Sequence, residues 1–145
     1  MTRSIVTIIA LLTTALAGAC GDGHDHQHGV DAAPGADAAP RQVVTDTRTL
    51  GAGEIIEATL TGGPADRADL HLTATVAELD WNIHGHVGGG TQTVAEGLSV
   101  LTADYAFTPS AQGEWFVLLR NSSAAPIDVT VRLELYGAIA WSGWL

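Results

Sequence analysis

The chain has 145 residues, a length that suits one domain with a single core. It carries 16 acidic residues against six basic ones, all of them arginine, so the formal net charge is -10. A surface this acidic repels phosphate groups, which argues against nucleic-acid binding and against electrostatic adsorption to anionic membranes. Cys20 is the only cysteine, and its isolation excludes an internal disulfide, a cysteine-based zinc site and an iron–sulfur cluster.

Residues 1–19 have the pattern of an export signal. Arg3 supplies a positive start, residues 5–16 form an apolar run, and Ala17-Gly18-Ala19 places small residues directly before Cys20. The apolar run is too short to span a hydrocarbon core of roughly 30 Å comfortably, so a retained transmembrane helix is the weaker alternative. The pattern predicts a signal peptide over residues 1–19 that is cleaved before the cysteine.

The segment Leu16-Ala17-Gly18-Ala19-Cys20 resembles the bacterial lipobox, in which small residues precede a cysteine that receives a diacylglycerol. The family prefers leucine three residues before the cysteine, whereas Ala17 holds that place here. An ordinary secretory signal, cut at the same bond, is the alternative. The resemblance implies a lipid on Cys20 that tethers the protein to a membrane. Gly21 replaces the aspartate of the familiar inner-membrane retention signal, which favours the outer membrane of the cell envelope.

Residues 20–41 differ in composition from residues 42–145. Gly, Asp, His, Ala and Pro dominate the segment, and Asp31-Ala32-Ala33-Pro34 is repeated as Asp37-Ala38-Ala39-Pro40. A segment without hydrophobic periodicity cannot bury enough apolar surface to offset the entropy lost on ordering. We therefore expect a disordered linker between the lipidated cysteine and a folded domain over residues 42–145.

In residues 42–145, short apolar runs are separated by Gly, Pro, Asn and Ser, a pattern that predicts an all-β domain. Residues 115–119 are apolar on both faces, as expected of a central strand that is covered on both sides. The strands should form a single antiparallel β-sandwich of jelly-roll type with about eight strands, because no helical crossover pattern intervenes. In chain order, strands are expected over residues 43–50, 54–61, 69–76, 80–87, 91–94, 104–108, 115–119 and 127–135.

The later part of the domain contains a characteristic succession of strand and turn residues. It comprises residues 104–109 (Asp-Tyr-Ala-Phe-Thr-Pro), 113–116 (Gly-Glu-Trp-Phe) and 120–123 (Arg-Asn-Ser-Ser). This succession resembles the closing strands of secreted jelly-roll modules of the GOLD-domain and bacterial pre-peptidase C-terminal types. The resemblance implies a non-catalytic accessory module that contacts a partner, and it carries over no catalytic residue.

The linker contains a candidate metal-binding segment. His24, His26 and His28 alternate with Asp25 and Gln27 in a flexible chain. Neutral imidazole binds Zn²⁺, Cu²⁺ and Ni²⁺, and flexibility lets the ligands reach the geometry that the ion prefers. The alternative interpretation is a polar, low-complexity spacer.

The expected strands carry a second candidate metal site. His84 and His86 occupy alternate positions and therefore share one face of their strand. If residues 69–76 and 80–87 form a hairpin, matching the apolar faces places His71 opposite one of these two histidines. Three imidazoles would then share one face. The alternative is that they are polar side chains on a solvated sheet.

The segment 138–145 contains Trp141 and Trp144. Tryptophan offers a large contact area at a low entropy cost, so an exposed pair could dock a protein or a sugar. Packing against the domain is the ordinary interpretation.

The sequence offers little support for catalysis. It has no G-x-S-x-G and no H-E-x-x-H motif, and Gly88-Gly89-Gly90 lacks the lysine that follows the glycines of a phosphate-binding loop. We expect a non-catalytic, lipid-tethered envelope protein whose acidic sandwich binds a protein or carbohydrate partner. The alternative function is metal handling, with Cu, Zn or Ni bound by the linker and strand histidines.

Overall fold

The computed structural model describes residues 38–145. The expected signal peptide, Cys20 and the linker histidines His24, His26 and His28 lie outside the described residues. Within residues 38–145 the chain forms strands and contains no helix. The strands are β1 (Gln42–Leu50), β2 (Ile55–Gly62), β3 (Arg67–Ala74), β4 (Leu79–Val87), β5 (Gly90–Val100), β6 (Thr102–Phe107), β7 (Gly113–Asn121), β8 (Ile127–Tyr136) and β9 (Ala140–Trp144).

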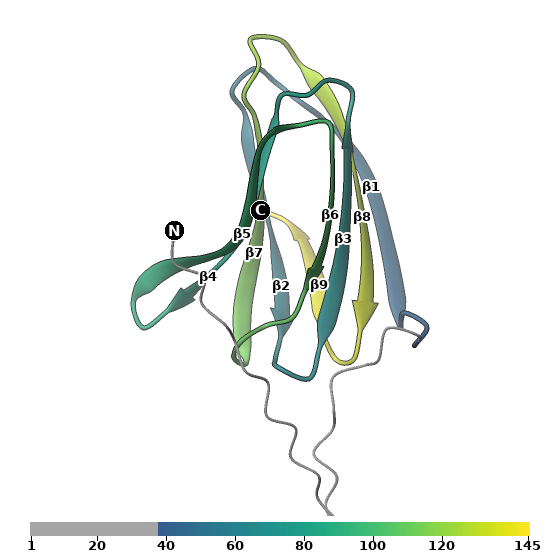
Figure 1. Ribbon diagram of the computed structural model, residues 1–145, viewed down its shortest axis with the longest axis vertical. Coiled ribbons are helices and arrows are strands. Elements are labelled where there is room, and N and C mark those ends of the chain that lie inside the picture. Colours follow the sequence, from purple (N-terminus) through teal and green to yellow (C-terminus); the bar gives the residue numbers. More distant parts are fainter. Residues whose placement is uncertain (1–37) are drawn as a thin grey trace, which may run out of the picture.

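The strands form two antiparallel sheets that face each other (Figure 1). One sheet has the order β1-β8-β3-β6 and the other the order β5-β4-β7-β2-β9. Apart from the β4–β5 hairpin, which lies within one sheet, successive strands alternate between the two sheets, which is the arrangement of a jelly roll. The predicted all-β sandwich is confirmed, and all eight expected strands are present.

Two strands differ from the expectation. β9 was not predicted, because Ala-Trp-Ser-Gly-Trp lacks the β-branched residues that usually mark a strand. β5 runs to Val100 and is far longer than residues 91–94, since Gly97 and Ser99 gave its second half the composition of a turn.

The expected hairpin between β3 and β4 is not formed. β3 pairs with β6 and β8, whereas β4 pairs with β5 and β7 in the other sheet. Residues 75–78 therefore cross from one sheet to the other. A hairpin and a crossover both require a short turn, so the local sequence does not distinguish them.

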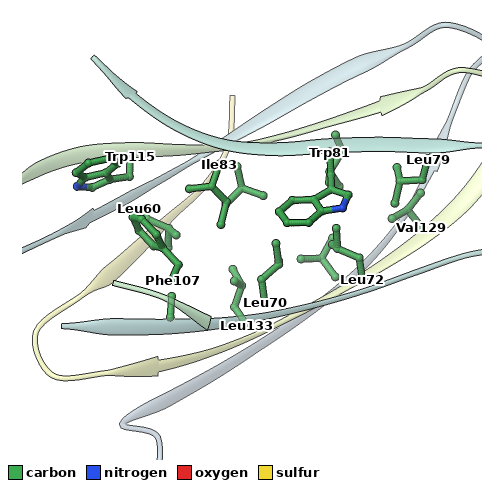
Figure 2. Close-up of a cluster of buried hydrophobic side chains, with 14 of the residues drawn as sticks. Leu60, Leu70, Leu72, Leu79, Trp81, Ile83, Phe107, Trp115, Val129 and Leu133 are labelled. Carbon is green, nitrogen blue, oxygen red and sulfur yellow. The ribbon is translucent and has the colours of Figure 1, made fainter. Parts of the chain in front are cut away.

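The core lies between the two sheets and is built from alternate residues of each strand (Figure 2). Leu70 and Leu72 of β3 point toward Trp81 and Ile83 of β4, as the alternation of each strand predicted. Each fully buried side chain of this size contributes roughly 1.5–3 kcal/mol through its removal from water. The largest fully buried side chains are Trp115, Phe107, Leu50, Leu60, Leu70, Leu72, Leu79, Ile83, Leu119, Leu133, Leu135 and Ile139.

Buried polar side chains hold the turns at the two ends of the sandwich. The Asn121 amide donates to the Ala125 carbonyl at 2.7 Å and to two carbonyls at the end of β1. At the other end, the Asp66 carboxylate accepts from the backbone nitrogens of Gly63 at 2.8 Å and Ala138 at 2.5 Å. These bonds satisfy backbone groups that the sheet ladders leave free.

Candidate functional site

The outer face of the five-stranded sheet is the candidate site. Its side chains are those that alternate with the core residues of β2, β4, β5 and β7, and they point away from the opposite sheet. We call this surface the imidazole face and define it as Ile55, Glu57, Thr59, Thr61, Asp80, Asn82, His84, His86, Thr93, Glu96, Leu98, Glu114, Phe116, Leu118 and Arg120.

Strand β7 leaves apolar side chains on the imidazole face. The expectation that residues 115–119 are covered on both sides is wrong, because the opposite sheet covers only the side that carries Trp115, Val117 and Leu119. Phe116 and Leu118 lie on the other side and are only partly buried. Within residues 38–145 no strand packs over this side, so the apolar side chains of a central strand lie in the middle of this surface.

Two strongly exposed aliphatic side chains extend the apolar character of the imidazole face. Ile55 of β2 is 57% exposed and Leu98 of β5 is 71% exposed. The β4–β5 register places two residues of β5, Leu98 and Ser99, opposite Asp80 alone, which forms a β-bulge. Ser99 has a φ of 51°, a left-handed conformation that costs a residue with a Cβ about 1–2 kcal/mol. Its backbone nitrogen donates to the Asp80 carboxylate at 2.9 Å.

An aromatic cluster surrounds His84 at the centre of this face. The His84 ring is 7% exposed and stacks on Phe116, with ring centroids 5.3 Å apart and an interplanar angle of 23°. The His86 ring meets His84 edge to face at 5.5 Å and lies 5.2 Å from Phe116. His86 itself is exposed, near the end of the β4–β5 hairpin that projects beyond the rest of the sandwich (Figure 1).

The polar contacts of His84 determine its protonation. Its Nδ1 atom lies 2.8 Å from Asn82 Oδ1, and its Nε2 atom lies 3.3 Å from Glu57 Oε1. Burial lowers the pKa of His84 below the ordinary 6.5, although the Glu57 carboxylate acts in the opposite direction. The ring is therefore neutral at pH 7. Each ring nitrogen faces an acceptor oxygen, Nδ1 that of Asn82 and Nε2 that of Glu57, to which it can donate the ring proton.

His71 lies on the opposite side of the molecule, so the predicted meeting of three strand histidines is wrong. It belongs to β3, and its Nδ1 atom lies 2.6 Å from Asp104 Oδ1 on the neighbouring β6. The misplaced hairpin caused the error, since β3 and β4 belong to different sheets. Among residues 38–145, no group of three or more His, Cys, Asp or Glu side chains is assembled for a metal ion.

The outer face of the four-stranded sheet, on which His71 lies, is polar. Thr47 and Thr130 share a hydroxyl hydrogen bond of 2.9 Å across β1 and β8, and Arg132 forms an ion pair with Glu134. We call this surface the threonine face and define it as Val43, Thr45, Thr47, Thr49, Arg67, Asp69, His71, Thr73, Thr102, Asp104, Asp128, Thr130, Arg132 and Glu134.

An arginine anchors one end of the threonine face. The Arg67 guanidinium lies over the Tyr136 ring at 4.0 Å, and its Nε atom lies 3.1 Å from Asp69 Oδ1, an ion pair without hydrogen-bond geometry. Tyr136 in turn donates to Glu134 at 2.7 Å. The charged groups of this face are thus paired with one another.

The C-terminal tryptophans pack against the domain, in agreement with the ordinary interpretation of that segment. Trp141 and Trp144 are partly buried against the core, and their rings meet edge to face at 5.2 Å. Trp144 Nε1 donates to Asp46 Oδ2 at 2.7 Å, which links β9 to β1 of the other sheet. The hydrogen bond from Arg48, followed by that from Trp144, lowers the pKa of the Asp46 carboxyl.

Sequence reasoning missed Glu57 and Phe116, the two residues that complete the His84 cluster. Glu57 lies across β7 from β4, so its proximity to His84 depends on the strand order and not on any local spacing. The available signal for Phe116 was the apolar character of both sides of β7.

Comparisons with known proteins support the fold. No protein-family model and no curated protein matches the chain, whereas 11 chains of solved structures do. The mitogen derived from Yersinia pseudotuberculosis is 14% identical, covers 73% of this chain and 95% of its own, and superposes with a TM-score of 0.52. The Aeromonas hydrophila protein PliG, a periplasmic inhibitor of g-type lysozyme, is 9% identical over 70% of this chain and 91% of its own, with a TM-score of 0.47.

A de novo designed double-stranded β-helix is also similar, at 23% identity over 63% of this chain and 99% of its own, with a TM-score of 0.37. At such identities the likeness to the mitogen shows a shared sandwich fold. The GOLD and pre-peptidase resemblance remains a prediction beyond that fold. The described part of the chain contains no helix with the length and apolar character of a membrane span.

Proposed function

We propose that the sandwich is a non-catalytic binding module and that it contacts its partner through the imidazole face. The observation that carries this proposal is the apolar outer side of β7, where Phe116 and Leu118 lie on the same sheet face as the exposed residues Ile55 and Leu98. Large apolar side chains that remain exposed on one sheet face favour an interaction site. The fold that the chain shares with a mitogen is compatible with a binding role.

Site-specific photo-crosslinking in the producing cell tests the face. One variant carries p-benzoylphenylalanine in place of Phe116, and the matched control carries it in place of exposed Thr73 on the threonine face. The proposal predicts a discrete crosslinked adduct from position 116 and none from position 73. Adducts of equal yield from both positions, or an adduct from position 73 alone, would contradict it.

We further propose that a lipid on Cys20 tethers the module to a membrane of the cell envelope, and that this membrane is the outer one. The support is the lipobox-like segment and the linker-type composition of residues 20–41. Labelling cells with radioactive palmitate tests the tether, because the protein should take up label and fractionate with membranes. Cys20→Ser should lose both properties. Label that persists in this variant, or that the natural chain never acquires, would contradict the tether.

A further inference from the structure

The carboxylates of the two outer sheet faces differ in their partners. On the threonine face, arginines form ion pairs with Asp69 and Glu134, and an imidazole contacts Asp104. The fourth carboxylate, that of Asp128, accepts a hydrogen bond from a threonine hydroxyl at 2.6 Å. None of the carboxylates that define the threonine face is therefore left without a contact.

Two carboxylates of the imidazole face have no such partner. Glu96 of β5 and Glu114 of β7 are exposed, and within the described part of the chain neither takes part in an ion pair. The other two carboxylates of this face, Asp80 and Glu57, contact a backbone nitrogen and an imidazole. Arg120 is the only arginine among the residues that define the face, so the face carries an excess of negative charge.

The strand register places carboxylates around the apolar side chains of β7. One row of the outer face runs across four strands and consists of Glu96, Asn82, Leu118 and Glu57. Glu114 precedes Phe116 by two residues and lies on the same side of β7. Leu118 and Phe116 are therefore bordered by carboxylates both across the sheet and along their own strand.

The spacing of the two unpaired carboxylates excludes a single ion as their common ligand. Neighbouring strands lie about 4.8 Å apart and a strand rises about 3.4 Å per residue, which puts the Cα atoms of Glu96 and Glu114 about 16 Å apart. The ligand atoms of one metal ion lie within about 2–3 Å of it. Two separate positive groups on one surface, with an apolar contact between them, would meet both carboxylates.

We propose that the partner of the imidazole face is a basic protein. Its apolar side chains pack on the apolar side of β7, and its lysine or arginine groups pair with Glu96 and Glu114. This inference rests on the proposed function of the face and adds the chemistry of the partner. Opposite charges around an apolar contact speed association and select the partner. A second copy of this acidic chain, a nucleic acid or an anionic membrane would instead bring like charges together.

The test measures the yield of the adduct that p-benzoylphenylalanine at position 116 forms in permeabilised cells of the producer. With the natural carboxylates, the yield should fall about threefold or more between about 0.1 M and about 1 M NaCl, because the screening length drops from about 10 Å to about 3 Å. Glu96→Gln combined with Glu114→Gln should lower the yield at the lower salt by a similar factor and remove most of the salt dependence. Both side chains are exposed, so their replacement leaves the fold intact.

The matched control removes two carboxylates from the threonine face, as Asp104→Asn combined with Asp128→Asn, and should keep both the yield and its salt dependence. An equal loss in this control would assign the effect to the overall charge of the chain and overturn the proposal. An adduct whose yield depends neither on salt nor on Glu96 and Glu114 would also overturn it, while the proposed binding function would stand. No adduct from position 116 under any condition would overturn both.

Discussion

The outer faces of the two sheets are built on the same sandwich but use their side chains in opposite ways. On the threonine face, hydroxyls and charges pair with one another across the strands, as Thr47 with Thr130 and Arg132 with Glu134. On the imidazole face, Phe116 and Leu118 are only partly buried although they belong to a central strand, and Ile55 and Leu98 are exposed on the same face. The polar groups of the threonine face therefore contact one another, whereas the imidazole face leaves apolar side chains exposed.

The largest effect is expected directly beneath the imidazole face. Gly85 lies between His84 and His86, and a Cβ at this position would come within 2.8 Å of the Trp115 ring. Gly85→Ala should destabilise the protein by about 2–3 kcal/mol in urea unfolding, because the ring is fully buried and has no room to move. Gly90→Ala in the same hairpin is the control, since nothing lies within 4 Å of its added Cβ. Equal midpoints for the two variants would show that this packing is not tight.

A smaller loss of stability is expected from the threonine face. Arg67→Ala removes the ion pair with Asp69 and the stacking over Tyr136, and it should cost about 1–2 kcal/mol. The yield of the crosslinked adduct between the Arg67→Ala variant and the partner, formed from position 116, should be unchanged. If the adduct disappeared while the protein remained folded, partner binding on the imidazole face would depend on the threonine face, which contradicts the proposal.

The pH dependence of stability should reveal the buried histidine of the imidazole face, His84. Because the pKa of His84 is lowered from 6.5 in the folded protein, the unfolded chain binds its proton at a higher pH. Stability should therefore fall as the pH drops from 6.5 through the folded-state pKa of His84. Urea unfolding at several pH values should show that His84→Gln flattens this slope. A slope that persists in His84→Gln would assign it to another group.

The smallest change in stability is expected at the rim of the imidazole face. Leu98 is 71% exposed, so Leu98→Ser should alter the free energy of unfolding by no more than about 0.5 kcal/mol. Crosslinking of the partner from position 116 should nevertheless weaken, since an apolar contact is lost. Val43 is an aliphatic residue on the four-stranded sheet that is 47% exposed, and Val43→Ser should leave the adduct intact. Equal adduct yields from the two variants would contradict a role for Leu98.

The sequence was sufficient for the fold but not for the site. Strict alternation along β8 and the turn residues between strands predicted the sandwich, since both depend on local chemistry. The meeting of Glu57 and His84 depends on the strand order β4-β7-β2, which is decided by packing between residues distant in the chain. The same limit applies to residues 115–119 of β7. Their sequence is apolar on both sides, and it does not reveal which side another sheet covers.

The most direct test of the central claim compares thiol protection on the two faces. Leu98→Cys and Thr73→Cys place one exposed thiol on the imidazole face and one on the threonine face. Each variant is labelled with a maleimide small enough to enter the envelope, both in intact cells and after purification. If a partner covers the imidazole face, the thiol at position 98 should react with the maleimide more slowly in cells than in the purified protein. The thiol at position 73 should react at the same rate in both. Equal reactivity of position 98 in cells and in isolation would show that nothing covers the imidazole face and would contradict the account.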